Sequence, residues 1–240
     1  MIQTDFFVSS SETGADLCIR TSRLLGIFQD AAAEDCAINL HLGREELLRL
    51  CGGLWIVSRT SLYLDLPVTV GKYSLTTWHA GVHGVLWNRG YALQNASDRT
   101  VARCITQWTI LSEGLPRRIL RLPDAPAPAP TPFGFSLPPL LRFRTDSLTL
   151  SGERRIGRSI LDENRHCNNA LAADIIEDAL SDTVPLSGTL PRLRELHLHY
   201  CGEAHCGDTL DLLTGSDDLF QYAVTSRDGE RIHEAALRRE

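Results

Sequence analysis

The placement of proline divides this chain more sharply than any other feature of its sequence. Eight of the eleven prolines lie between Pro116 and Pro139, and every second residue from Pro126 to Pro132 is proline. Because proline donates no backbone hydrogen bond, alternating prolines favour an extended polyproline-like connector over a sheet strand or a helix interior. We therefore expect a linker over 121–140 that joins two domains, 1–120 and 141–240, each of ordinary domain size.

The first domain is predicted to begin with a helix and to continue with long strands. Thr21 or Ser22 suits the N-cap of this helix, and apolar residues recur at helical spacing over 24–31. A second, shorter helical turn is expected over 44–50. Alternation of side-chain character then predicts antiparallel strands at 54–63, through Trp78, at 85–95 and at 101–112.

The second domain repeats this order of elements. A helix over 169–180 is expected to turn Ile175 and Ile176 inward and Asp174 and Glu177 outward. Strands are predicted at 192–202, 208–214, 219–226 and 231–238, and Asp228-Gly229 marks a hairpin between the last two. A long helix followed by antiparallel strands, occurring twice, predicts an α+β fold in which a curved sheet wraps each helix.

Charge and hydropathy exclude several classes of protein. The 30 acidic and 24 basic residues leave a net charge of -6, which is unsuited to nucleic acid. The sequence has no run of ~18 apolar residues that would span a membrane, and its start lacks the basic and apolar segments of a secretory signal. The seven cysteines form no CxxC pair, which favours reduced thiols, so we expect a cytoplasmic protein.

The segment with the clearest chemical content lies just ahead of the second predicted helix. Asp162, Asn164 and His166 are spaced by two, so an extended loop would project their side chains to one side. Asn168 and Asn169 suit the helix N-cap, and the free N–H groups of a helix terminus stabilise an oxyanion. An imidazole, an amide and a carboxylate beside such a terminus are sufficient for attack of water on a thioester. An Asx-rich turn that only starts the helix is the alternative interpretation.

This segment resembles the DxNxHxNN signature of the acyl-acyl-carrier-protein thioesterases, a family built from two fused hotdog folds. Further motifs of that family are similar to segments found in the same order along nearly the whole chain. These segments are Gln29-Asp30-x-Ala32, Trp55-Ile-Val-Ser-Arg59, Thr77-Trp78 followed by Arg89, Gln107-Trp108, and Tyr200-Cys-Gly-Glu203. The resemblance implies two tandem hotdog folds, with the first as the acyl-chain-binding half and the second carrying the catalytic residues.

The resemblance also implies which residues act. Carried over position by position, the family's active site corresponds to Asp162, Asn164, His166 and Glu203. Our hypothesis is that His166 and Glu203 handle water and proton, Asn164 contacts the thioester and Asp162 orients the others. Plant relatives have a cysteine directly after this glutamate, whereas this chain has Ala204, which argues against a cysteine nucleophile.

The second helix departs from the family pattern. Asn168 and Asn169 are kept as substrate-binding residues, but Ala172 and Ile175 occupy places where relatives usually carry aromatic rings. Two missing rings leave volume that either neighbouring side chains refill or the acyl pocket gains. We expect Ala172 and Ile175 to border the acyl chain, with refilling by neighbours as the alternative.

The resemblance implies acyl carrier protein as the partner, with no cofactor, metal, nucleic acid or membrane, and it is consistent with a homodimer. Segment 117–165 carries a net charge of +4, whereas carrier proteins are acidic. The arginines expected to dock the carrier protein are Arg117, Arg118, Arg154, Arg155 and Arg158. A solvated linker with basic flanks is the alternative interpretation of this charge.

Two other groups of residues have a structural and a functional interpretation. His197, His199 and Cys201 would share one face of a strand near His205 and Cys206, which is compatible with a metal site, but a half-buried structural strand is favoured. The four tryptophans all lie in the first half, and we expect most of them in the core, with lining of an acyl tunnel as the alternative.

The function predicted from the resemblance is hydrolysis of fatty acyl-acyl-carrier-protein thioesters to free fatty acid and carrier protein, which terminates fatty acid synthesis. Three alternatives stay open: an acyl-CoA thioesterase, a hotdog dehydratase or hydratase, and a non-catalytic acyl-binding protein. Dehydratases of this fold tend to place the histidine five residues after the aspartate, whereas Asp162 and His166 are four apart. Intact polar residues at the site argue against a non-catalytic protein.

Overall fold

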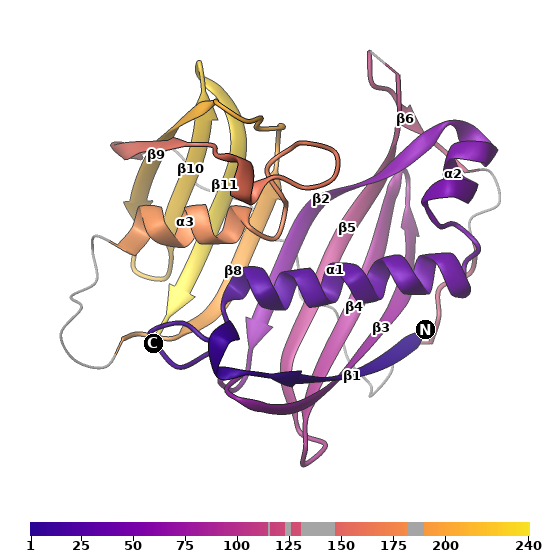
Figure 1. The fold of residues 1–240 in the computed structure, drawn as a ribbon, viewed down its shortest axis with the longest axis horizontal. Helices are drawn as coiled ribbons and strands as arrows, with labels where there is room; N and C mark the ends of the chain where they lie inside the picture. The colour runs from indigo at the N-terminus through magenta and orange to yellow at the C-terminus, as the bar shows by residue number, and fades with distance from the viewer. Residues whose placement is uncertain (115, 123–125, 131–146, 182–189) are drawn as a thin grey trace.

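A computed structural model describes residues 1–114, 116–122, 126–130, 147–181 and 190–240. In these ranges eleven strands form one sheet, ordered β1-β3-β4-β5-β2-β8-β11-β10-β9-β7 with β6 beside β5, and all pairs are antiparallel. The sheet curves around the two long helices α1 and α3, which lie against the same face (Figure 1). This architecture confirms the predicted fold class, two tandem hotdog folds in one chain.

The first half forms one end of the sheet and supplies the longest helix. Its elements are β1 (Ile2–Val8), a 3-10 turn (Ser10–Glu12), α1 (Thr21–Ile38), α2 (Arg44–Cys51), β2 (Gly53–Leu64), β3 (Gly71–His83), β4 (Leu86–Asn95), β5 (Thr100–Ser112) and β6 (Ile119–Leu120). Leu24, Phe28 and Ala31 of α1 are buried at helical spacing against the sheet. Gly52 ends α2 in the left-handed conformation, at φ 64°, that glycine adopts without strain.

The second half forms the other end of the sheet around a shorter helix. Its elements are β7 (Thr149–Arg155), a 3-10 turn (Arg158–Ile160), α3 (Ala172–Ser181), β8 (Leu193–Tyr200), β9 (Thr209–Ser216), β10 (Gln221–Arg227) and β11 (Glu230–Arg239). Asp228 and Gly229 both have positive φ, 53° and 80°, which a type I′ hairpin turn requires, so the predicted hairpin is confirmed.

Among the strands of the described residues, one pair joins the two halves, β2 with β8. Leu62 lies opposite Leu196, and Thr60 lies opposite Leu198. The main hydrophobic core runs across this joint, because it contains Phe28 of α1 and Ile176 of α3 together with leucines of both strands. This packing fixes the loop before α3 against the first half of the molecule.

Two details of the predicted helices are wrong. The N-cap of α1 is Arg20, not Thr21 or Ser22. The hydroxyl of Ser22 bonds to Asp174 of α3, and that of Thr21 bonds to Glu177. Asp174 and Glu177 consequently face the start of α1. The amphipathic pattern had predicted that both would face the solvent.

Part of the predicted linker lies outside the described residues, at 123–125 and 131–140. The described piece, 126–130, runs beside β3, where the Ala129 N–H donates to the carbonyl of His79 at 2.9 Å. Within the described residues, no helix combines the length and the apolar character needed to cross a membrane.

Candidate active site

Three of the four predicted catalytic residues, Asp162, Asn164 and His166, lie in a tight hairpin turn that precedes α3. Leu161 pairs with Cys167, and the Asp162 N–H donates to the carbonyl of His166 at 2.8 Å. Arg165 has φ 65°, a left-handed conformation that costs a non-glycine residue energy, so the surrounding contacts must enforce it. The spacing of the three residues had predicted an extended loop, whereas the structure has a closed turn.

Asp162 stabilises this turn from within. Its Oδ1 atom accepts hydrogen bonds from the backbone N–H groups of Asn164, at 2.8 Å, and of His166, at 3.1 Å. The carboxylate is thus directed at its own backbone, and it does not project to one side with the other two side chains. This geometry lets Asp162 stabilise the backbone of the turn that carries Asn164 and His166.

His166 and Glu203 are brought together by backbone pairing between two segments of the second half. His166 pairs with His205, and the Cys167 N–H donates to the carbonyl of Ala204 at 2.7 Å. As a result the Nε2 atom of His166 lies 3.5 Å from the Oε2 atom of Glu203. Both side chains keep partial contact with solvent, 22% exposed for His166 and 37% for Glu203.

Two arginines of the first half hold this arrangement from the opposite side. Arg117 forms an ion pair with the Oε1 atom of Glu203. Arg44, at the start of α2, donates to Oδ1 of Asn164 at 3.2 Å and to Glu163 at 2.6 Å. No motif surrounds Arg44 in the sequence, so its contact with Asn164 was not predicted, and Arg117 was expected on a docking surface. In the structure the guanidinium group of Arg117 forms its ion pair with Glu203.

A pocket of about 430 Å³ opens beside Asn164 and His166, and the first half supplies most of its wall. Trp55, Trp87 and Trp108 line it, together with one face of α1 that includes Ala32. Trp78 alone among the four tryptophans is fully buried away from this wall. Trp78 and Trp87 are buried in the core, as expected, and Trp55 and Trp108 pack against the cluster that contains Trp87. Three of the four also border the pocket, as the alternative interpretation predicted.

The pocket also has a charged inner wall. Arg89 lines it and pairs with Asp35 of α1 at 2.7 Å, where the side chains are 5% and 0% exposed. His79 lies nearby, and burial lowers the pKa of its imidazole. A buried ion pair of this kind is sensitive to the loss of either partner, because the remaining charge stays desolvated.

The four residues expected to bind substrate lie in different places. Asn168 caps the turn before α3, because its Oδ1 atom accepts from the N–H groups of Ala170 and Leu171. The carbonyl of Asn169 accepts from the Tyr200 hydroxyl at 3.1 Å.

Ala172 and Ile175 do not line the pocket beside His166. Ala172 is 0% exposed, and Ile175 is 2% exposed in a separate cluster with Ile156 and Leu210. Both lie in the wrapped interior of the second half, and Ile175 also lines a second cavity together with Leu24 and Leu62. Contact of either residue with an acyl chain therefore stays a prediction.

A cation site is compatible with the candidate active site only in part. Among the described residues His166, Glu203 and His205 offer ligand atoms within 4.8 Å of one another. Tetrahedral zinc needs ligand atoms about 3.4 Å apart, and the positive charge of Arg117 on Glu203 disfavours a second cation. His197, for which a structural role on its strand was favoured over a metal site, bonds to Ser61 at 2.9 Å and to Glu195 at 2.8 Å.

Comparison with known proteins identifies solved structures of the same fold. An acyl-ACP thioesterase from Bacteroides thetaiotaomicron superposes with a TM-score of 0.83 at 17% identity, covering 99% of this chain and 97% of that one. A 12:0-ACP thioesterase from Umbellularia californica gives 0.77 at 16% identity, covering 100% and 96%. A MaoC-like dehydratase from Phytophthora capsici gives 0.55 at 10% identity, covering 78% and 72%. No protein-family model and no curated protein sequence matches the chain.

Proposed function

We propose that this protein is a thioesterase that hydrolyses fatty acyl thioesters of acyl carrier protein, releasing free fatty acid and ending chain growth. The observation that carries the proposal is the pairing of His166 with Glu203 at 3.5 Å, where His166 lines a pocket walled by tryptophans. Such a pocket suits an alkyl chain, and a histidine paired with a carboxylate suits general acid–base catalysis. The shared fold with two ACP thioesterases supports the same assignment.

In the proposed reaction His166 removes a proton from water while the water oxygen attacks the thioester carbon. Glu203 orients the imidazole and stabilises its positive charge, and Arg117 holds the other carboxylate oxygen in place. When the carbon–sulfur bond breaks, His166 returns the proton to the departing sulfur. The products are a carboxylic acid and the free thiol of the carrier.

The carbonyl oxygen of the thioester becomes an anion in the transition state and needs donors. Arg44 occupies the Oδ1 atom of Asn164, which leaves the amide NH₂ group free to donate to the substrate. The first turn of α3, which follows Asn168, adds the positive end of a helix dipole. Asp162 acts through the backbone of the turn and touches no substrate.

The division of labour between the two halves follows from the same contacts. The first half supplies most of the pocket wall and is the acyl-binding half, whereas the second half supplies His166 and Glu203. Arg118, Arg155 and Arg158 are exposed and are the docking residues for the acidic carrier protein. Arg154 lies 3.8 Å from Asp178 in a weak ion pair, so it contributes less to docking of the carrier protein.

The test uses acyl-carrier-protein and acyl-CoA thioesters with chains of matched length. We expect faster release of free thiol from the carrier-protein substrates, with a KM that rises with salt because exposed charges are screened. The double reversal Arg155→Glu and Arg158→Glu should raise the KM for the carrier-protein substrate far more than for its CoA counterpart. Equal effects on both would remove the docking assignment, and hydration of enoyl thioesters without hydrolysis would make the protein a hydratase.

A further inference from the structure

The hairpin turn that carries His166 occurs a second time, before α1. Leu17 has φ 64°, and Arg165 has φ 65°. Thr13 pairs with Ile19 as Leu161 pairs with Cys167. The closing hydrogen bonds match as well: Gly14 N–H to Cys18 carbonyl at 2.8 Å, and Asp162 N–H to His166 carbonyl at 2.8 Å. The first half therefore keeps the backbone of a catalytic turn.

The segment that faces this turn is repeated too. The Ile19 N–H donates to the carbonyl of Val68 at 2.7 Å, just as Cys167 donates to Ala204 at 2.7 Å. Pro67 precedes Val68, in the place that Glu203 holds before Ala204. The correspondence thus extends to both sides of the site, although almost no residue identity reveals it.

The side chains at the equivalent positions have changed. Cys18 takes the place of His166, Asp16 that of Asn164, and Pro67 that of Glu203. Burial raises the pKa of the Cys18 thiol to about 11, so the sulfur is protonated at neutral pH and is a poor nucleophile. The one carboxylate in this copy of the turn, that of Asp16, accepts from the Cys18 N–H at 3.0 Å, and no imidazole stands beside it to form a pair like that of His166 with Glu203.

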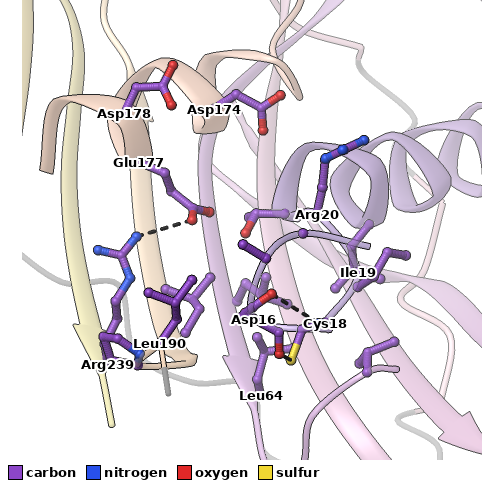
Figure 2. Close-up of a pocket in the computed structure, with 18 of the residues that line it drawn as sticks. Asp16, Cys18, Ile19, Arg20, Leu64, Asp174, Glu177, Asp178, Leu190 and Arg239 are labelled. Carbon is purple, nitrogen blue, oxygen red and sulfur yellow. Dashed lines mark hydrogen bonds and ion pairs between the residues drawn. The ribbon is translucent and has the colours of Figure 1, made fainter. Parts of the chain in front are cut away.

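A cavity of about 500 Å³ nevertheless opens beside Cys18, as the catalytic pocket opens beside His166 (Figure 2). The two cavities lie toward opposite ends of α1 and β2: Leu24 and Leu62 line this one, whereas Ala32 and Ile56 line the other. The apolar part of the wall, including Leu64 and Leu193, gives it the mixed character of a ligand site.

The charges around the cavity restrict what it binds. Four carboxylates line it, from Asp16, Asp174, Glu177 and Asp178, against three guanidinium groups. Glu177 pairs with Arg239 at 3.1 Å, and Arg154 lies 3.8 Å from Asp178. This excess of negative charge would repel an anionic headgroup. A neutral ligand with amide groups would avoid that repulsion and could hydrogen-bond to both the carboxylates and the guanidinium groups.

We propose that this cavity is a second, non-hydrolytic ligand site that binds the acyl-pantetheine part of a thioester. The inference rests on the proposed function for its class of ligand, because it takes the repeated turn to hold the same chemical group in both halves. The site binds without turnover, since Cys18 and Pro67 replace the histidine and the glutamate.

Cys18 itself reports whether the cavity is occupied. The probe is an S-(2-oxoalkyl)pantetheine, a neutral ketone that water does not cleave, and labelling of Cys18 by a maleimide is followed by peptide mass spectrometry. At a ligand concentration about ten times its Kd, labelling of Cys18 should slow by about tenfold, because the site is mostly occupied. Cys201, which is exposed and outside both cavities, should label at an unchanged rate.

Two further measurements make the result specific. Ala15→Trp, at the exposed rim of the cavity, should abolish protection of Cys18, whereas Ala96→Trp in the β4–β5 turn should not. A free fatty acid of the same length should protect Cys18 much less. Unprotected Cys18 at ligand concentrations that inhibit hydrolysis would overturn the second site and leave the proposed function intact. Protection by fatty acid equal to that by the ketone would overturn the assignment of a neutral ligand, and protection without any hydrolytic activity would overturn the proposed function alone.

Discussion

The Nε2 atom of His166 lies 3.5 Å from the Oε2 atom of Glu203, on a turn and a loop that backbone pairing holds together. The second oxygen of Glu203 is paired with Arg117, which comes from the first half of the chain. The candidate site is thus assembled across the joint between the halves, and its pocket is built mainly by the half without the histidine.

The ion pair with Arg117 leads to the first prediction. Arg117→Ala should lower kcat by at least about tenfold, because Glu203 loses the partner that fixes its orientation toward His166. The matched control is Arg118→Ala, since Arg118 is exposed and its side chain does not line the pocket. Steady-state kinetics at saturating acyl-carrier-protein thioester give kcat for both variants, because loss of a docking contact at Arg118 raises KM and leaves kcat unchanged. A fall in kcat for Arg118→Ala as large as that for Arg117→Ala would show that the charge of the segment matters and not the contact.

The pocket wall predicts how chain-length preference will respond to mutation. Ile56→Trp fills part of the cavity and should shift kcat/KM toward shorter acyl chains, by more than tenfold if three methylenes are excluded at ~0.8 kcal/mol each. Ile119→Trp, at a residue 57% exposed and outside the pocket, serves as the control. The profile of Ile56→Trp should differ from the wild type, and a profile identical to that of Ile119→Trp would locate the acyl chain elsewhere.

Ala172→Tyr should behave differently. Ala172 is 0% exposed, so a tyrosine there overpacks the interior of the second half and should lower stability by about 1–3 kcal/mol. Chain-length preference among the remaining folded protein should not change. Thermal unfolding and kcat/KM across chain lengths, measured on the same preparations, decide between the two effects. A shifted chain-length profile would show that Ala172 borders the acyl chain.

The buried pair of Asp35 and Arg89 is expected to contribute to folding as well as to the pocket. Asp35→Ala leaves Arg89 desolvated without its partner and should lower the free energy of unfolding by about 3–5 kcal/mol. Replacing both, as Asp35→Leu with Arg89→Met, should recover much of that loss. Urea denaturation of both variants measures the difference. A double variant no more stable than Asp35→Ala would mean that the charge left on Arg89 is not what destabilises the single variant.

His233 predicts a pH dependence of stability. Burial lowers the pKa of this imidazole to about 4, from the ordinary value of 6.5, and its Nδ1 atom contacts the Thr225 hydroxyl at 2.9 Å. Protonation therefore favours the unfolded chain, so the stabilising contribution is complete above pH 6.5 and is lost as pH falls toward 4. At pH 5 the loss from this residue amounts to about 2 kcal/mol.

The variant His233→Asn removes the titration while keeping an amide near Thr225. Its unfolding free energy should fall less steeply between pH 7 and pH 5 than that of the wild type, whatever its absolute stability. Chemical denaturation at several pH values gives both slopes. Parallel slopes would show that other groups cause the acid sensitivity.

Local sequence patterns predicted most of the fold. The strand expected over 54–63 corresponds to β2, although burial does not alternate along it. The polar turn after Asn95 corresponds to the β4–β5 hairpin, because turn chemistry is a local property. Strand β1 was missed, although Ile2, Thr4 and Phe6 alternate with more exposed residues and carried a usable signal.

The contacts across the joint could not be predicted in the same way. Arg44 reaches Asn164, and Arg117 reaches Glu203, through a pairing of β2 with β8 that no local pattern encodes. The turn before α1 was likewise not found from sequence, since its equivalence to the turn before α3 lies in backbone geometry and not in residue identity.

The central claim is that His166 drives hydrolysis of an acyl-carrier-protein thioester, and release of free thiol tests it most directly. The wild-type protein should release thiol from such a substrate, and His166→Ala should do so at least about a hundredfold more slowly, as expected on loss of a positioned acid–base group. His83→Ala, on the exposed end of β3, should match the wild type. Equal rates for His166→Ala and the wild type, with both proteins folded, would contradict the account.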